Sequence, residues 1–282
     1  MNLKTVFRPI HTSAAVLGSA AGVAALTLAV TTPAGAAQAE HHPASKKPTI
    51  VLVHGAFADS SSWNGVIERL QHDGYPVVAP ANPLRGLASD ADYLGSFLKS
   101  VHGPVVLVGH SYGGAVITQA AAGDPEVKAL VYIAAFAPQV GESALELSNK
   151  FPGSTLGATL NSVSFPLSGG GTGTDLYIKA DKFHDQFAAD VPTSVTDLMA
   201  ATQRPVTASA LDEKATEAAW KTIPSWDLIT TQDKNIPPAS QRFMAQRAHA
   251  HTVEVNASHA VAVSRPTAVT RLIEQASHVT TR

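Results

Sequence analysis

Residues 104–114 read PVVLVGHSYGG, and this stretch decides the fold. Its first five residues form an apolar run of the length of a buried strand, and residues 114–122 have the spacing of a helix. Ser111 stands on the turn between them, in the pattern Gly-x-Ser-x-Gly. Only small neighbours tolerate so sharp a turn, which pushes the serine hydroxyl outward at the amino end of the helix. The stretch therefore predicts a strand, a turn and a helix that present Ser111 as a nucleophile.

Strand-like runs and amphipathic stretches alternate on both sides of this unit. Five further runs have the length and composition of strands: Thr49–Val53, Pro76–Pro80, Val127–Ala134, Ile223–Thr230 and Thr252–Val255. Residues with helical spacing lie between them at 63–71 and 90–101, and after the last run at 264–275. Strands that are apolar on both faces and alternate with helices predict an α/β fold with a mostly parallel sheet, covered by helices on both sides.

The segment from Gln139 to Lys221 breaks this alternation. It contains no β-branched run of core type, its glycine-rich residues 168–174 predict a flexible loop, and the rest predicts short helices. We expect a cap at about residues 139–221, over the carboxyl edge of the sheet, where open α/β sheets bind ligands. Its large apolar residues need burial, which argues against a disordered segment.

Composition excludes several classes of protein. The 282 residues include 20 Lys+Arg and 22 Asp+Glu, so the formal charge of −2 offers no basic surface for nucleic acid. The chain has no cysteine, which rules out disulfides and zinc-thiolate sites. His249 and His251 are spaced as a conceivable metal pair, but without acidic or cysteine partners nearby they indicate a solvated surface.

The first 39 residues predict a secretory signal peptide. Lys4 and Arg8 precede an apolar run, and small residues after it allow cleavage following Ala36 or Ala39. An uncleaved anchor is the alternative, but the run is interrupted by glycine and is shorter than the about 20 residues that a spanning helix needs. We expect residues 40–47 to be a polar leader and residues 48–282 to form one secreted, extracellular domain, without stable membrane insertion.

A serine nucleophile needs a base and an acid that orients the base. In this architecture the acid and then the base follow the serine, each on a loop after a later strand. Asp233 stands just after the run that ends at Thr230, whereas its rival Asp227 lies inside that run. Of the 12 histidines only His259 lies in the loop just past the last strand. His54 and His110 flank the turns and are expected to pack or hydrogen-bond there.

The loop after the first strand, residues 54–57, reads HGAF. Gly55 allows the backbone to turn an amide toward the substrate, so the Ala56 and Tyr112 N–H groups are the predicted oxyanion hole. Phe57 is the alternative donor to Ala56. Phe57, Phe136 and Trp220 are candidates for an apolar substrate pocket, although large apolar side chains more often belong to the core.

The motifs around His54, Ser111, Asp233 and His259 follow one another along the chain in the order found in the α/β-hydrolase superfamily. Over residues 48–282 the sequence therefore resembles that superfamily. Within it, residues 51–56 and the short cap resemble the branch of small bacterial esterases, plant methylesterases and hydroxynitrile lyases. The resemblance implies a sheet of about eight strands. It also implies a serine hydrolase that cleaves a small-molecule ester through an acyl-enzyme, with no metal or organic cofactor.

Several other activities of this superfamily require different residues at some of these positions. A cofactor-free haloperoxidase or perhydrolase uses the same triad and stays open as an alternative. A hydroxynitrile lyase of this branch is expected to carry lysine directly after the catalytic histidine, where this chain has Ala260. A dehalogenase or epoxide hydrolase would have aspartate in place of Ser111. An inactive binding module typically lacks a triad member, whereas this chain has all three.

Overall fold

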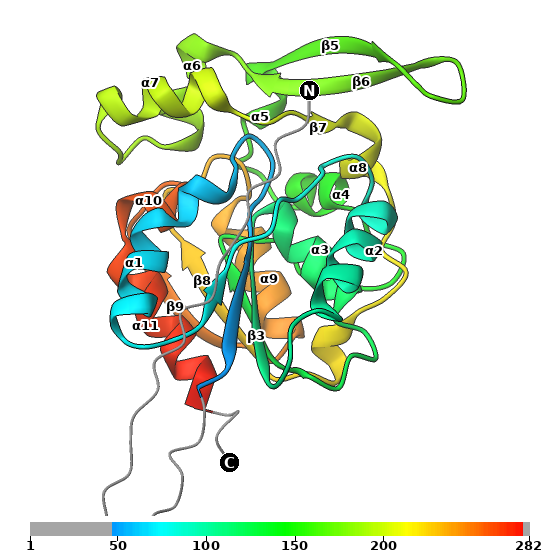
Figure 1. The fold of residues 1–282 in the computed structure, drawn as a ribbon. Helices are drawn as coiled ribbons and strands as arrows, with labels where there is room; N and C mark the ends of the chain where they lie inside the picture. Colours follow the sequence, from blue (N-terminus) through cyan, green and yellow to red (C-terminus); the bar gives the residue numbers. More distant parts are fainter. Residues whose placement is uncertain (1–46, 279–282) are drawn as a thin grey trace, which may run out of the picture. The chain divides into compact units, whose positions relative to one another are not determined.

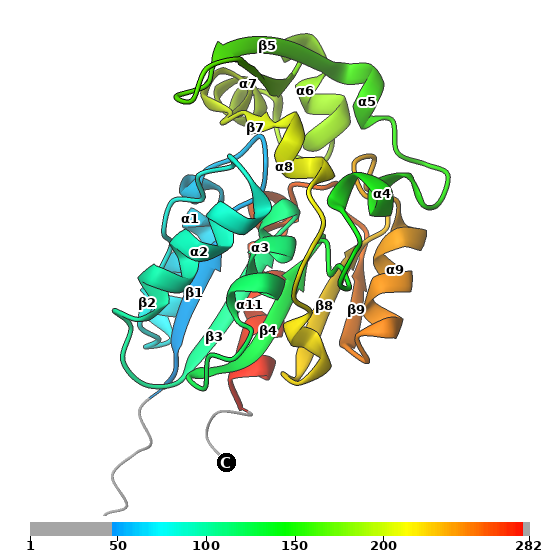
Figure 2. The same ribbon diagram turned by 90° about the vertical axis from the view of Figure 1, so that its right-hand side faces the viewer.

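The computed structural model describes residues 47–278, so the predicted signal peptide and nearly all of the leader lie outside it. Its central sheet has six parallel strands in the order β2-β1-β3-β4-β8-β9 (Figures 1 and 2). They are β1 (Thr49–Val53), β2 (Val77–Val78), β3 (Val105–His110), β4 (Val127–Ile133), β8 (Ser225–Thr230) and β9 (His251–Val255). The α/β fold is confirmed. The six strands coincide with the six strand-like runs of the sequence. The resemblance implied a sheet of about eight strands, whereas the central sheet of the described residues has six.

Helices cover both faces of the sheet. One face carries α1 (Asn64–His72), α10 (Val261–Ser264) and α11 (Pro266–Ser277), and the other carries α2 (Leu87–Leu98), α3 (Tyr112–Ala120) and α9 (Pro238–Arg247) (Figure 1). Alternate residues of β1 reach opposite layers: Ile50 and Leu52 pack toward α1 and α11, while Val51 and Val53 pack toward α2 and α3. This double burial explains why the central strands β1, β3 and β4 are mostly apolar, whereas β9 at the edge of the sheet is partly exposed and contains polar residues.

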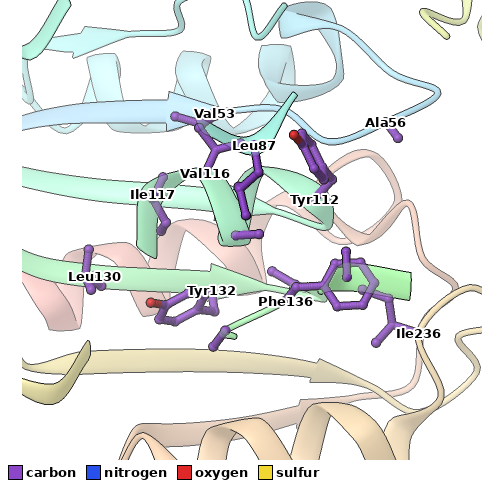
Figure 3. Close-up of a cluster of buried hydrophobic side chains, with 14 of the residues drawn as sticks. Val53, Ala56, Leu87, Tyr112, Val116, Ile117, Leu130, Tyr132, Phe136 and Ile236 are labelled. Atoms are coloured by element: carbon purple, nitrogen blue, oxygen red, sulfur yellow. The ribbon is translucent and has the colours of Figure 1, made fainter. Parts of the chain in front are cut away.

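The core on the α2, α3 and α9 side extends to the carboxyl edge of the sheet. Figure 3 shows Tyr132 and Leu130 of β4 under Val116 and Ile117 of α3. The same cluster continues to Phe136 and Ile236, which lie at the end of the sheet where Ala56 and Tyr112 also stand (Figure 3). The residues that surround Ser111 are thus continuous with the core, which holds the site rigid.

The cap lies over the carboxyl ends of the strands (Figures 1 and 2). Its helices are α4 (Ala144–Asn149), α5 (Leu156–Thr159), α6 (Ala180–Phe187), α7 (Thr193–Thr202) and α8 (Ala208–Asp212). A 3-10 turn, η2 (Ala219–Lys221), leads from the cap to β8. Another 3-10 turn, η1 (Ser60–Trp63), lies outside the cap, after β1. The cap also holds a three-stranded antiparallel sheet of β5 (Leu160–Pro166), β6 (Thr172–Ile178) and β7 (Val206–Thr207).

This second sheet corrects the expectation of helices alone. The glycine-rich stretch is the turn of the β5–β6 hairpin, closed by a hydrogen bond from Leu167 N–H to Gly171 O of 3.2 Å. Gly170 and Gly171 both have φ of 88°, a conformation that favours glycine. The hairpin is largely exposed, so its strands mix polar and apolar residues and do not have the composition of core strands.

No helix among residues 47–278 is long and apolar enough to cross a membrane.

Candidate active site

Ser111 occupies a strained turn between β3 and α3. Its φ of 54° and ψ of −125° are unusual for a residue with a side chain. The turn is also tightly packed, because a Cβ added at Gly113 would lie 2.5 Å from the carbonyl oxygen of Val53. A Cβ added at Gly55 would lie 2.6 Å from the Ser111 Cβ, so the loop after β1 can approach the serine only because residue 55 is glycine. The helix begins at Tyr112, two residues earlier than the spacing predicted.

The structure brings Ser111, His259 and Asp233 together from three separate loops. The His259 Nε2 lies 2.8 Å from the Ser111 Oγ, and the His259 Nδ1 lies 2.7 Å from the Asp233 Oδ2. A carboxylate can only accept, so Nδ1 carries the proton and Nε2 is free to accept the serine proton. All three side chains are buried, with exposed fractions of 6% for Ser111, 1% for His259 and 4% for Asp233. The hydrogen bonds are therefore largely shielded from water.

Four donors besides His259 hold the Asp233 carboxylate. Its Oδ1 accepts from the N–H groups of Asn235 and Ile236, at 2.8 and 2.9 Å. Its Oδ2 accepts from the Thr230 hydroxyl at 2.9 Å and from Gln241 Nε2 at 3.0 Å. Sequence reasoning missed Thr230 and Gln241. The signal for Gln241 is its place on helix α9, one turn before the buried Met244 and Ala245, on the face that meets the core.

Asp227 has a different environment. It lies inside β8, opposite Tyr132 of β4, and neither of its carboxylate oxygens has a hydrogen-bond partner among the described residues. Complete burial raises the pKa of the Asp227 carboxyl well above its ordinary value. The geometry thus connects His259 with Asp233, and Asp227 is a buried carboxylic acid of the core.

We expect Asp227→Asn to make the protein more stable at pH 8 and to change its stability little at pH 4. Because the pKa is raised in the folded state, the folded protein retains a proton that the unfolded chain has lost above a pH of about 3.9. The free energy of unfolding of the unmodified protein therefore falls as the pH rises above about 3.9, whereas an asparagine at this position does not titrate. Urea unfolding at pH 4 and pH 8 measures this, and an equal effect of the substitution at both values would contradict it.

His110 supports the loop that carries His259. Its Nε2–H donates to the His259 carbonyl oxygen at 2.9 Å, and its ring centroid lies 4.7 Å from the His259 ring. Burial lowers the pKa of His110 to about 3, so this ring is neutral at physiological pH. His110 therefore supports the His259 loop as a neutral hydrogen-bond donor.

The loop after β1 is fixed by His54. The backbone N–H of Asn82 donates to His54 Nε2 at 3.0 Å, so His54 Nδ1 carries the proton that it donates to the Gly55 carbonyl at 2.9 Å. The Asn82 side-chain amide also donates to the His54 carbonyl oxygen, at 2.9 Å. These bonds set the direction of the next two peptide groups.

The structure distinguishes the two candidate oxyanion donors of this loop. The Phe57 N–H donates to the Arg204 carbonyl oxygen of the cap at 3.0 Å and is not free to bind substrate. Within residues 47–278, neither the Ala56 N–H nor the Tyr112 N–H has a hydrogen-bond partner. This arrangement favours the pair Ala56 and Tyr112 over Phe57.

A cavity of about 180 Å³ adjoins Ser111 and His259. Phe57 and Phe136 line it, as the sequence suggested, together with leucines of the cap: Leu145, Leu156, Leu160, Leu176 and Leu211. A few polar residues, Ser148, Asn149, Ser154 and Asn235, also reach it. None of the described residues that line it is Lys, Arg, Asp or Glu. The cavity therefore suits an uncharged, largely apolar group.

Trp220 does not line this cavity, which corrects the expectation for it. It lies in η2, just before the amino end of β8, whereas the cavity is at the carboxyl ends of the strands. Its indole N–H donates to the Pro138 carbonyl oxygen at 2.8 Å, and the Arg247 guanidinium lies 5.4 Å from its ring centroid. Trp220 is therefore a packing residue, held by Pro138 and Arg247.

Of the two histidines near β9, His251 packs against an aromatic ring of the sheet. The His251 ring lies 5.1 Å from the Trp226 ring with the planes inclined by 30°. No group of three or more His, Cys, Asp or Glu residues that could hold a metal ion is present in the described part of the chain.

Residues 50–272, which include the turn at Ser111, match the model of a protein family described as "Alpha/beta hydrolase family". The chain belongs to this family. The hydrolase is 30% identical to the alpha/beta hydrolase nvfD of Aspergillus novofumigatus over 82% of this chain and 97% of that protein. It is also 34% identical to the carbendazim hydrolyzing esterase of a Nocardioides species, over 36% of this chain and 47% of that protein.

Among solved structures, the hydrolase is similar to polyneuridine aldehyde esterase. The TM-score is 0.72 at 17% identity, over 82% of this chain and 99% of that one. At this identity the likeness concerns the fold, and it includes the cap as well as the sheet because nearly the whole of that chain is covered.

Proposed function

We propose that this hydrolase cleaves carboxylic esters of small, uncharged substrates with a triad of Ser111, His259 and Asp233. The observation that carries the proposal is the buried His259 ring, hydrogen-bonded to the Ser111 Oγ on one side and to the Asp233 carboxylate on the other. The esterase among its sequence relatives supports the reaction class. The uncharged cavity beside Ser111 supports the substrate class.

The proposed reaction passes through an acyl-enzyme. His259 Nε2 takes the hydroxyl proton as the Ser111 Oγ attacks the ester carbonyl, and Asp233 holds the ring and stabilises its positive charge. The Ala56 and Tyr112 N–H groups stabilise the oxyanion, an interaction for which one donor contributes about 3 kcal/mol in comparable sites. His259 then gives the proton to the departing alcohol. Water activated by the same histidine releases the acid.

Hydrolysis is favoured over cyanohydrin cleavage by the charges at the site. A lyase must stabilise departing cyanide, which calls for a cation beside the base. Residue 260 is a buried alanine, and no Lys or Arg of the described chain lines the cavity.

The test is a substrate panel on the purified protein. We expect turnover of p-nitrophenyl acetate and butyrate, with an initial burst of p-nitrophenol if deacylation is slow, and no release of cyanide from mandelonitrile above the uncatalysed rate. Cyanide release as fast as the best ester turnover would overturn the assignment. Oxidation of a halide with peroxide and acetate, without ester turnover, would favour the perhydrolase alternative.

We also propose that residues 1–39 direct secretion. Lys4 and Arg8 before an apolar run, and the small residues near Ala36 and Ala39, support it. Expressed in a secreting bacterium, the protein is expected in the medium with its amino terminus at Ala37 or Glu40. Intact-mass measurement decides this, since Met1 or its successor retained in a membrane fraction would favour an anchor.

A further inference from the structure

A second hollow lies beside the catalytic cavity, and Phe57 is the one residue that lines both. The outer hollow has a volume of about 210 Å³ and runs between the η1 segment and helix α7 of the cap. Its apolar lining is provided by Ala58, Val195, Leu198, Met199 and Val263. Phe57 is therefore the described residue that contacts both spaces.

Phe57 is held firmly in this position. Its N–H donates to the Arg204 carbonyl oxygen at 3.0 Å, and its side chain is buried. Its ring meets Phe187 edge-on with centroids 6.4 Å apart, and Phe187 in turn lies 5.0 Å from the His259 ring. Phe57 also has a φ of 61°, which a residue with a side chain adopts at some cost in free energy. The fold thus keeps the Phe57 ring in place directly after Ala56, despite the strain in the backbone of Phe57.

We propose that Phe57 is a wall that sets the upper size limit of the substrate, and that the outer hollow becomes a binding site for a longer apolar chain only when this ring is removed. The proposal rests on the esterase function proposed above. An apolar cavity of about 150 Å³ holds benzene. The catalytic cavity, at about 180 Å³, takes little more than that, so the substrate class is esters with a short acyl or a benzoyl-sized group.

The outer hollow would roughly double the available volume. Polar residues also line it, namely Asp59, Ser61, Ser62, Thr202 and Gln203, but Val195, Leu198 and Met199 of α7 offer apolar surface against which an alkyl chain would gain free energy. In the unmodified protein such a chain meets the Phe57 ring instead. Size discrimination in an apolar pocket amounts to about 10–200-fold for each methylene group.

The test uses p-nitrophenyl esters from acetate to octanoate and the variant Phe57→Gly. Glycine suits a φ of 61°, so the substitution removes the ring without adding backbone strain. We expect the ratio of kcat/KM for octanoate to kcat/KM for acetate to rise at least about tenfold in this variant. An unchanged ratio would overturn the proposal. Leu211→Ala is the matched control, because it enlarges the catalytic cavity without opening it to the outer hollow, and it should raise this ratio much less than Phe57→Gly does.

A second substitution tests the outer hollow itself. Leu198 is 69% exposed, so Leu198→Asp should fold normally. It is expected to change octanoate hydrolysis by less than twofold in the otherwise unmodified protein, and to remove most of the octanoate gain in the Phe57→Gly background. A large loss of octanoate turnover from Leu198→Asp alone would show that the hollow already belongs to the site, which contradicts a wall at Phe57.

Binding of alcohols gives a readout that does not depend on catalysis. In thermal-shift titrations, 1-butanol should stabilise both proteins, whereas 1-octanol should stabilise Phe57→Gly much more than the unmodified protein. If no ester is hydrolysed but octanol discriminates in this way, the proposed function fails and the wall stands. If octanol stabilises both proteins equally, the wall is refuted whatever the enzyme hydrolyses.

Discussion

Ser111→Ala is expected to lower ester turnover by about 10⁶-fold, the scale of nucleophile loss in other serine hydrolases. The variant loses the Oγ that lies 2.8 Å from His259, while the oxyanion donors and the cavity remain. The fold should persist, because only one oxygen atom is removed from a residue at the end of the cavity. Initial rates with p-nitrophenyl butyrate measure the loss, and circular dichroism with urea unfolding provides the control. Wild-type turnover by a homogeneous preparation of the variant would refute Ser111 as nucleophile.

Asp233→Asn is expected to lower turnover by about 10⁴-fold at neutral pH, as the comparable change does in serine proteases. An asparagine amide that donates to His259 Nδ1 would place the proton on Nε2, where it can no longer accept from Ser111. The backbone N–H groups of Asn235 and Ile236 would still hold the side-chain oxygen at the Oδ1 position, whereas the amide nitrogen would replace Oδ2 and lose the bond that Oδ2 accepts from Gln241.

Asp227→Asn is the matched control for this substitution. It changes the same functional group on the same strand-loop unit, but its carboxylate contacts neither His259 nor any other hydrogen-bond partner in the described chain. Turnover should stay within about threefold once stability is matched. A larger loss of turnover from Asp227→Asn than from Asp233→Asn would assign the orienting acid to Asp227.

The positions of Ser111, Asp233 and His259 could be predicted because each lies shortly after a run with the length and composition of a strand. In a parallel sheet the carboxyl ends of such strands meet at one edge, so the order along the chain places the loops together. The glycines around Ser111 added local evidence, since close approach of β1, β3 and α3 leaves no room for a Cβ at Gly113. The geometry of 2.7 and 2.8 Å could not be predicted from spacing alone.

The position of the cap in the chain could be predicted from the sequence, but its three-stranded sheet could not. Strands β5 and β6 pair mainly with each other and have an exposed face, so they carry no apolar signature that separates them from loops. The roles of Phe57 and Trp220 depended on tertiary contacts with Arg204 and Pro138, which are distant in the sequence. Sequence reasoning gave both aromatics the same role, while the structure puts only Phe57 at the cavity.

The most direct test of the account is covalent labelling with a fluorophosphonate, which reacts only with an activated serine. Peptide mass spectrometry of the labelled protein should find one modification, on Ser111, and His259→Ala should abolish it although Ser111 is still present. An unlabelled protein, a label on another residue, or labelling of His259→Ala at the unmodified rate would contradict activation of Ser111 by His259.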